Sequence, residues 1–328
     1  MMIKNGQDLS LKTIFLLLLS LTGLIWFLPH VPQHPIWERL QFFLILLFPI
    51  ILSYKYFYFK KPLIKQSLVY LGFYIVLSLT TFVIHIWQLQ WEIANPNGLF
   101  EFKVYIDPLL ASIPFNDGMW LWELSTPSLD RFFVYIYIHG FVFCILGLCL
   151  YYLVTGQPRK ILLAMFAGHF LQYLLILPFH FWVDGHQVWY IQNLWYGTNY
   201  IDPLLGYRTV TEPIIPSLNH VFPSMHTSIA IVTILLALRE KSKMIKYFYT
   251  ILNIGIIFST VYLGIHWVID LVGGALFGYL VLKVADKIMD VDWKETWSAV
   301  EQKTLTYLEK DQLPMPNSPI RYFWWDDQ

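Results

Sequence analysis

The chain has 328 residues, of which 57% are hydrophobic, 18% aromatic and only 13% charged, and its 22 Lys and Arg residues balance 22 Asp and Glu residues. A soluble globular domain carries about 25% charged residues, so this composition is typical of a membrane protein. The zero net charge gives no bulk attraction to nucleic acid. Cys144 and Cys149 lie five positions apart on different faces of an apolar segment. This spacing favours packed or lipid-facing thiols over a disulfide or a metal site.

Eight segments of the chain are apolar enough to cross a bilayer, which takes about 20 residues in a helix. The first is too long for a signal peptide and lacks a small-residue cleavage site, so we interpret it as a signal anchor. We therefore predict an all-α, polytopic membrane bundle of about eight transmembrane helices. Two long connections, 89–131 and 183–222, and a polar tail from about 288 complete the chain. The predicted spans are 12–29, 37–58, 66–88, 132–154, 161–182, 223–239, 245–264 and 266–287.

The placement of lysine and arginine predicts the orientation, because cytoplasmic loops carry an excess of these residues. With eight spans and a cytoplasmic N-terminus, most of the 22 Lys and Arg residues fall on the cytoplasmic side. Both long connections then face away from the cytoplasm, as do the start of the sixth span and the turn between the last two. We expect an integral protein of the cell membrane with both termini in the cytoplasm. The cations left on the outer side are Arg39, Lys103, Arg131 and Arg208.

His266 and Asp270 lie four residues apart at the start of the last span, so they share one helix face. An aspartate in this position can accept the Nδ1 proton of the histidine and leave Nε2 free as a nucleophile or base. Ionisable residues within a membrane are costly and mark functional sites. Two other interpretations stay open. One is a buried pair that locks two helices, and the other is a metal site that needs ligands beyond His226.

The stretch FPSMHT begins the sixth predicted span. A helix N-terminus gathers free backbone N–H groups and the positive end of the helix dipole, which suit a phosphate. Ser224 and Thr227 add hydroxyl groups, although Ser224 is equally typical of a plain helix cap. His226 can protonate a leaving oxygen. Together with His266 and Asp270, the pattern predicts phosphoryl transfer through a phosphohistidine, with no metal or other cofactor.

FPSMHT followed by STVYLGIHWVID resembles the motifs of the type 2 phosphatidic acid phosphatase superfamily, P-S-G-H and then S-R-x-x-x-x-x-H-x-x-x-D. The branch that looks nearest is the one similar to inositol phosphorylceramide synthases, which are inositolphosphotransferases. The resemblance covers about spans three to eight. It implies a six-helix phosphatase-type core over 65–288, with two additional helices over 1–64 and a cytoplasmic tail over 289–328.

By this resemblance, His266 is the nucleophile, Asp270 orients it, and His226 is the general acid for the leaving alcohol. Ser224 would be a phosphate ligand, and Thr227 lies beside it. The sequence departs from the phosphatase pattern in three places. A methionine replaces the motif glycine at 225, a threonine replaces the motif arginine at 260, and the first motif, K-x-x-x-x-x-x-R-P, is absent.

A bound phosphate needs positive charge, so other residues have to replace the missing cations. The candidates on the outer side are Arg208 in the second long connection, Arg131 at the end of the fourth span and His180 at the end of the fifth. Arg131 is also typical of a side chain that snorkels at a helix end. We interpret His85, His139 and His169, which lie deeper in apolar segments, as packing residues.

Two further features concern the surroundings of this cluster. Gly274 and Gly278 have the small-xxx-small spacing that allows close approach of a neighbouring helix. The connection 89–131 contains the segment MWLWEL. That segment is consistent either with a lid over a head-group site or with an ordinary interfacial loop.

These observations predict an enzyme that acts on a membrane lipid phosphate at the outer leaflet, with water or an alcohol as the acceptor. Water would make it a phosphatase, and an alcohol a phosphotransferase. The alternative is a non-enzymatic lipid-binding or transport protein with the same helical core. A transporter typically has broken helices or polar residues deep in several spans, whereas here the motif histidines lie at one membrane side.

Overall fold

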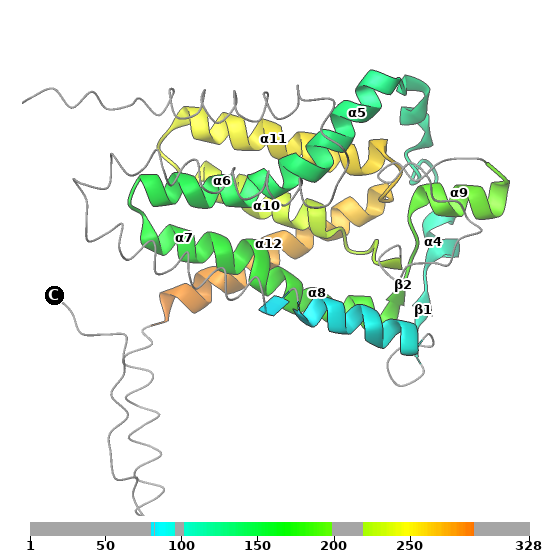
Figure 1. The fold of residues 1–328 in the computed structure, drawn as a ribbon, viewed down its shortest axis with the longest axis horizontal. Coiled ribbons are helices and arrows are strands. Elements are labelled where there is room, and N and C mark those ends of the chain that lie inside the picture. The colour runs from blue at the N-terminus through cyan, green and yellow to red at the C-terminus, as the bar shows by residue number, and fades with distance from the viewer. Residues whose placement is uncertain (1–79, 82, 96–101, 199–218, 292–328) are drawn as a thin grey trace, which may run out of the picture.

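The computed structural model describes residues 80–81, 83–95, 102–198 and 219–291 (Figure 1). The predicted spans 12–29 and 37–58, most of 66–88, and the tail lie outside these residues. The predicted division into segments 1–64, 65–288 and 289–328 therefore stays a prediction.

The described part is mostly helical, and its long helices run side by side in a bundle (Figure 1). Residues 80–81 and 83–94 are helical and lie beside α8. Two rods are built from consecutive pieces that continue through a π-helical turn. The first consists of α5 (Pro127–Tyr135), η3 (Ile136–Gly140) and α6 (Phe141–Val154), and the second of α7 (Pro158–Met165), η4 (Phe166–Phe170) and α8 (Leu171–Trp182). The remaining bundle helices are α10 (Met225–Leu238), α11 (Lys243–Tyr262) and α12 (Val268–Asp290).

Four of these helices are long and apolar enough to cross a membrane, which indicates an integral membrane protein. They are Pro127–Leu153, Pro158–Trp182, Lys243–Tyr262 and Val268–Asp290, and each overlaps a predicted span. The sixth predicted span, 223–239, corresponds to α10, which has only 14 residues. This shorter helix packs against α6, α7, α8, α11 and α12, so its neighbours surround it.

Residues 102–126, 183–198 and 219–222 of the two long connections form a folded cap over one end of the bundle (Figure 1). Strands β1 (Val104–Tyr105) and β2 (Val183–Asp184) pair in parallel and join the two connections. A buried core with Leu110, Trp189 and Trp267 fills the cap. The other cap elements are α4 (Asp107–Ser112), the 3-10 helix η2 (Met119–Leu124) and α9 (Val188–Tyr196).

Helices α10 and α12 approach each other closely along one face of α12. An added Cβ at Gly274 would lie 2.4 Å from the carbonyl oxygen of Ser224, and one at Gly278 would lie 2.4 Å from that of Ser228. No larger residue fits against a backbone at this distance. The small-xxx-small spacing therefore brings the start of α10 directly against the helix that carries Asp270.

We predict that Gly274→Ala lowers the thermal midpoint of the purified protein in detergent, because the added methyl group must push two helix backbones apart. Overpacking of this kind costs about 1–3 kcal/mol. Gly255→Ala in α11 is the matched control, since the nearest atom to its added Cβ, on Ile136, is 3.6 Å away. Alanine is favoured over glycine in a helix interior by about 0.5–1 kcal/mol, so the control should raise the midpoint. A midpoint for Gly274→Ala as high as that of Gly255→Ala would contradict the close contact.

Candidate active site

The N-terminus of α10 presents unused backbone donors. The N-cap is Ser224, which is fully buried, and its Oγ accepts a hydrogen bond from the amide of Thr227 at 3.3 Å. A hydroxyl group keeps its own proton to donate, so the cap can still contact a ligand. Among the described residues, the amides of Met225 and His226 donate no hydrogen bond. An anion at this position would therefore meet free N–H groups and the positive end of a 14-residue helix.

A tight turn between α11 and α12 positions His266. Gly264 has a φ of +63°, and an added Cβ there would lie 2.3 Å from the ring of Trp122. Both the left-handed backbone and the close indole require glycine. The amides of Ile265 and His266 donate to the carbonyl oxygen of Thr260 at 3.0 and 3.1 Å. Trp122 belongs to the MWLWEL segment, which thus forms η2 and packs on this turn.

The first turn of α12 is held by one residue of the cap. The amide of Val268 donates to the main-chain oxygen of Asn116 at 2.7 Å, and the amide of Ile269 donates to its Oδ1 at 2.8 Å. The Nδ2 of Asn116 donates in turn to the carbonyl oxygen of Leu110 at 2.8 Å. These bonds satisfy helix-end donors that would otherwise lack partners. The amides of Val268 and Ile269 at the start of α12 therefore already have acceptors, whereas those of Met225 and His226 have none among the described residues.

The two motif histidines face each other. The ring centroids of His226 and His266 are 6.0 Å apart, and the rings are inclined by 58°. His266 is 4% exposed, and its Nδ1 lies 3.4 Å from Oδ2 of the fully buried Asp270. The same Oδ2 accepts a hydrogen bond from the amide of Trp267 at 2.8 Å. The histidine contact is longer than a good N–H···O bond, and such contacts in a ligand-free site often tighten when substrate binds.

Two aromatic side chains surround His226. The ring of Tyr137 stacks on it at a centroid distance of 4.3 Å and 25°, and the ring of Phe141 lies at 4.2 Å and 40°. The Oη of Tyr137 is 3.4 Å from Nδ1 of His226. Neither residue was predicted from the sequence. Their segment, VYIYIHGF, is rich in aromatics that resemble any interfacial belt, so it carries no signal for a site.

The residues predicted as phosphate ligands do not all lie at the histidine pair. The hydroxyl of Thr227 is buried against α12 and, within the described residues, makes no hydrogen bond. Arg131 is exposed, and its Nε donates to the carbonyl oxygen of Pro127 in its own helix at 3.0 Å. Arg208 lies outside the described residues. His180 belongs to a separate buried cluster, where it stacks on His220 at 4.0 Å.

That separate cluster joins α8, the helix over 83–94 and the segment before α10. His220 contacts the carboxylate of Glu92 at 2.9 Å, and Gln88 donates to the same carboxylate at 2.9 Å. The Nδ1 of His180 is 3.0 Å from Nε2 of Gln88. These contacts fasten the chain just ahead of the FPSMHT stretch. Of the histidines interpreted as packing residues, His85 contacts the hydroxyl of Tyr173, His169 contacts Thr81, and His139 packs on Tyr135.

A second His–Asp pair supports the cap. The amide of His186 donates to Oδ1 of Asp107 at 2.7 Å, and its Nδ1 lies 2.6 Å from Oδ2 of the same carboxylate. The indole of Trp267 donates to the carbonyl oxygen of His186 at 2.9 Å. Burial, together with the negative charge of Asp107, raises the pKa of Tyr105 to about 12. The Asp107–His186 pair therefore links the start of α4, the segment after β2 and Trp267, the residue that follows His266.

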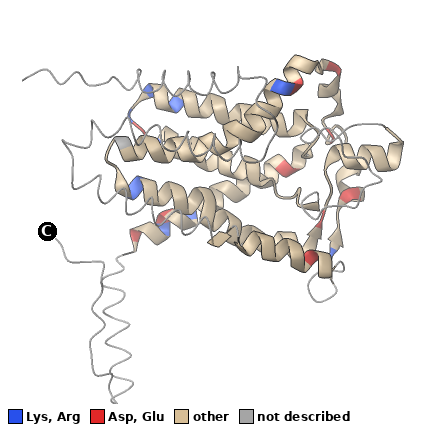
Figure 2. Cartoon of the chain, viewed as in Figure 1, with Lys and Arg blue, Asp and Glu red and all other residues tan. Residues whose placement is uncertain are grey.

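Most of the Lys and Arg residues that the structure describes lie at the opposite end of the bundle (Figure 2). There Arg159 pairs with Asp290, Lys160 with Glu240, and Arg239 with both oxygens of Asp286. The bonds to Asp286 raise the pKa of Arg239. In the part of the chain that the structure describes, the cap end holds two cations, Lys103 and Arg131, and Lys103 contacts Asp184.

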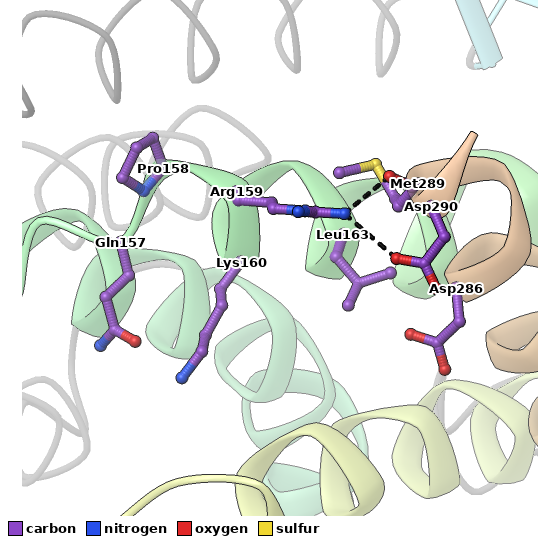
Figure 3. Close-up of a pocket in the computed structure, with 8 residues that line it drawn as sticks. All are labelled: Gln157, Pro158, Arg159, Lys160, Leu163, Asp286, Met289 and Asp290. Atoms are coloured by element: carbon purple, nitrogen blue, oxygen red, sulfur yellow. Dashed lines mark hydrogen bonds and ion pairs between the residues drawn. The ribbon is translucent and has the colours of Figure 1, made fainter. Parts of the chain in front are cut away.

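A cavity of about 450 Å³ lies at this charged end, between the start of α7 and the end of α12 (Figure 3). Asp290 is at the far end of the 23-residue α12 from His266, which is about 34 Å for an α-helix. The guanidinium of Arg159 is already bonded to Met289 and Asp290 (Figure 3). The cavity is therefore remote from the histidines. Its lining residues are Gln157, Pro158, Arg159, Lys160, Leu163, Asp286, Met289 and Asp290.

Comparison with known protein families gives a match over the part of the chain that carries both histidines and Asp270. A family model described as the PAP2 superfamily matches residues 160–293. The chain is 30% identical over 197 residues to Uncharacterized protein MJ0662 of Methanocaldococcus jannaschii, and the match covers 57% of this chain and 76% of that protein. No solved structure matches the chain. The described residues contain no group of three or more His, Cys, Asp or Glu side chains placed to hold a metal ion.

We predict that Asn116→Ala destabilises the protein, because it leaves the amide of Ile269 and the carbonyl oxygen of Leu110 without their buried partner. The loss should be about 1–3 kcal/mol in the free energy of unfolding. Asn95→Ala is the control, since the hydrogen bond that this exposed side chain makes among the described residues is to Trp91, in its own helix turn. Its effect should stay within about 0.5 kcal/mol. Denaturant unfolding in detergent measures both variants, and equal effects would show that Asn116 does not hold α12.

Proposed function

The chain belongs to the PAP2 superfamily, a superfamily of metal-independent phosphatases, and we propose that it is a membrane lipid phosphatase or lipid phosphotransferase working through a phosphohistidine. The family implies a phosphate-ester substrate. The observation that carries the proposal is that the two histidine rings lie 6.0 Å apart beside the first amides of α10, which have no acceptor among the described residues. One phosphoryl group can contact both rings, because reacting atoms stand about 3–3.5 Å apart and a proton donor acts at about 2.6–3.2 Å.

In the first step, Nε2 of His266 attacks phosphorus, and the bond to the leaving oxygen breaks. Asp270 accepts a hydrogen bond from the Nδ1–H of His266 and stabilises the positive charge that develops on the ring. His226 gives its proton to the leaving alcohol. In the second step an acceptor hydroxyl returns a proton to His226, its oxygen forms the new bond to phosphorus, and the bond to His266 breaks.

The phosphate oxygens need donors during both steps. The amides of Met225 and His226 and the hydroxyl groups of Ser224 and Thr227 supply them in this proposal. Thr260, at the position of the motif arginine, is buried, and its hydroxyl donates to the carbonyl oxygen of Ile257 at 2.7 Å. It brings no positive charge. We therefore propose Arg208 and Arg131 as the cations that approach the phosphate from the outer side.

The membrane arrangement supports a site at the outer leaflet. Most of the described Lys and Arg residues lie at the end of the bundle opposite the cap (Figure 2), and an excess of these residues is typical of cytoplasmic loops. A site at the membrane edge lets acyl chains stay in lipid while the phosphate reaches the rings. The similarity to inositol phosphorylceramide synthases makes an alcohol acceptor as credible as water.

We predict that His266→Gln reduces phosphate release and head-group transfer by a factor of about 10³ or more, because the nucleophile is lost. Labelled lipid phosphate should leave an acid-labile, alkali-stable label on the native protein and none on the variant. His139→Gln is the matched control, since this histidine packs on Tyr135 and has no role in the proposed mechanism. Full activity in His266→Gln would refute the mechanism.

We predict that wild-type protein turns over at least one lipid phosphate when a panel of such lipids is supplied with water alone or with inositol and other alcohols. Following released phosphate and new lipid products side by side separates a phosphatase from a phosphotransferase. An alcohol acceptor should lower phosphate release while a new phosphodiester appears. Absence of both products across the panel would favour the non-enzymatic lipid-binding or transport protein.

A further inference from the structure

The proposed chemistry requires different protonation states of the two histidines. The nucleophile needs an Nε2 without a proton, whereas the general acid needs a proton on the nitrogen that faces the leaving oxygen. A neutral imidazole has one donor and one acceptor nitrogen, so the partner of Nδ1 decides which state Nε2 adopts. The two rings therefore require different partners at Nδ1.

The partners are in fact different in kind. Nδ1 of His266 faces a carboxylate of Asp270, which can only accept a hydrogen bond when ionised. This carboxylate places the proton of His266 on Nδ1 and leaves Nε2 with an unshared electron pair. Nδ1 of His226 faces the Oη of Tyr137 at 3.4 Å, and a phenol hydroxyl can donate. Donation from Tyr137 places the proton of His226 on Nε2.

The packing around His226 holds its Nδ1 close to the hydroxyl of Tyr137. Its ring lies against the rings of both Tyr137 and Phe141, at centroid distances of 4.3 and 4.2 Å. Tyr137 is itself 8% exposed and lies within the π-helical turn η3. Turns of this kind occur frequently at functional sites. The stack restricts rotation of the imidazole, so Nδ1 stays towards the phenol.

We propose that Tyr137 is a positioning residue that fixes the Nε2-protonated form of His226 and replaces the proton that this ring loses. As the Nε2 proton leaves with the alcohol, the phenol proton passes to Nδ1, so the imidazole stays neutral and the phenol becomes a phenolate. Both transfers reverse when the acceptor hydroxyl gives its proton to Nε2. The proposal rests on the proposed function, since it assigns the proton that leaves with the alcohol. Tyr137 does not touch the substrate in this scheme and acts through His226.

The test compares two substrates that differ in their need for an acid. An alkyl lipid phosphate has a poor leaving group and needs protonation, whereas p-nitrophenyl phosphate releases an anion that is stable without it. Tyr137→Phe keeps the ring stack and removes only the hydroxyl. General acid catalysis contributes about 10²–10⁴ in rate, and we expect kcat for the lipid to fall by about tenfold or more while kcat for p-nitrophenyl phosphate changes less than about threefold.

Tyr135→Phe, two residues earlier in the same rod, is the matched control and should leave both rates within about twofold. Equal losses on both substrates would show a structural role for Tyr137, and unchanged rates would show none. Either result overturns the proposal. If wild-type protein turns over neither substrate, the proposed function itself has failed, which is a separate outcome.

A second measurement does not depend on a variant that folds. Nitrogen-15 shifts of the His226 ring in the wild-type protein report which nitrogen carries the proton. We expect protonated Nε2 and unprotonated Nδ1. The opposite assignment would overturn the proposal even if Tyr137→Phe were too unstable to assay.

Discussion

A single backbone hydrogen bond joins the two halves of the site: the amide of Ser224 donates to the carbonyl oxygen of Asp270 at 3.1 Å. It forms because Gly274 and Gly278 let α12 approach the carbonyl groups of α10 without a side chain between them. The free amides of one helix and the carboxylate of the other are therefore set against each other by main-chain contacts.

Residues of the cap hold the turn that carries His266 and the start of α12. Trp122 covers the turn at Gly264, Asn116 closes the start of α12, and Trp267 is bonded to the segment that carries the Asp107–His186 pair. These contacts hold His266 from three directions. The turn that carries the histidine proposed to attack phosphorus is therefore held by cap residues as well as by the two helices that it joins.

The sequence was sufficient for the apolar helices and for the two motifs, because span length and the His-x-x-x-Asp spacing are local properties. Four helices that could cross a membrane were confirmed, and superfamily membership agrees with the motif resemblance. The cap was predicted as loops, because strands of two residues and a six-residue helix leave no periodic pattern. Asn116 and Tyr137 were missed because their roles arise from contacts across more than 80 residues of chain, whereas their local sequence resembles an ordinary loop and an aromatic belt.

The region that matches the superfamily begins at residue 160, after the rod that carries Tyr137 and Phe141 and after the first half of the cap. A fragment cut to the matched boundaries would retain both histidines and Asp270. It would lack the aromatic surface beneath one ring and the cover over the other. In this protein, the residues that match the superfamily and the residues that form the site therefore have different boundaries. The residues that form the site begin well before residue 160.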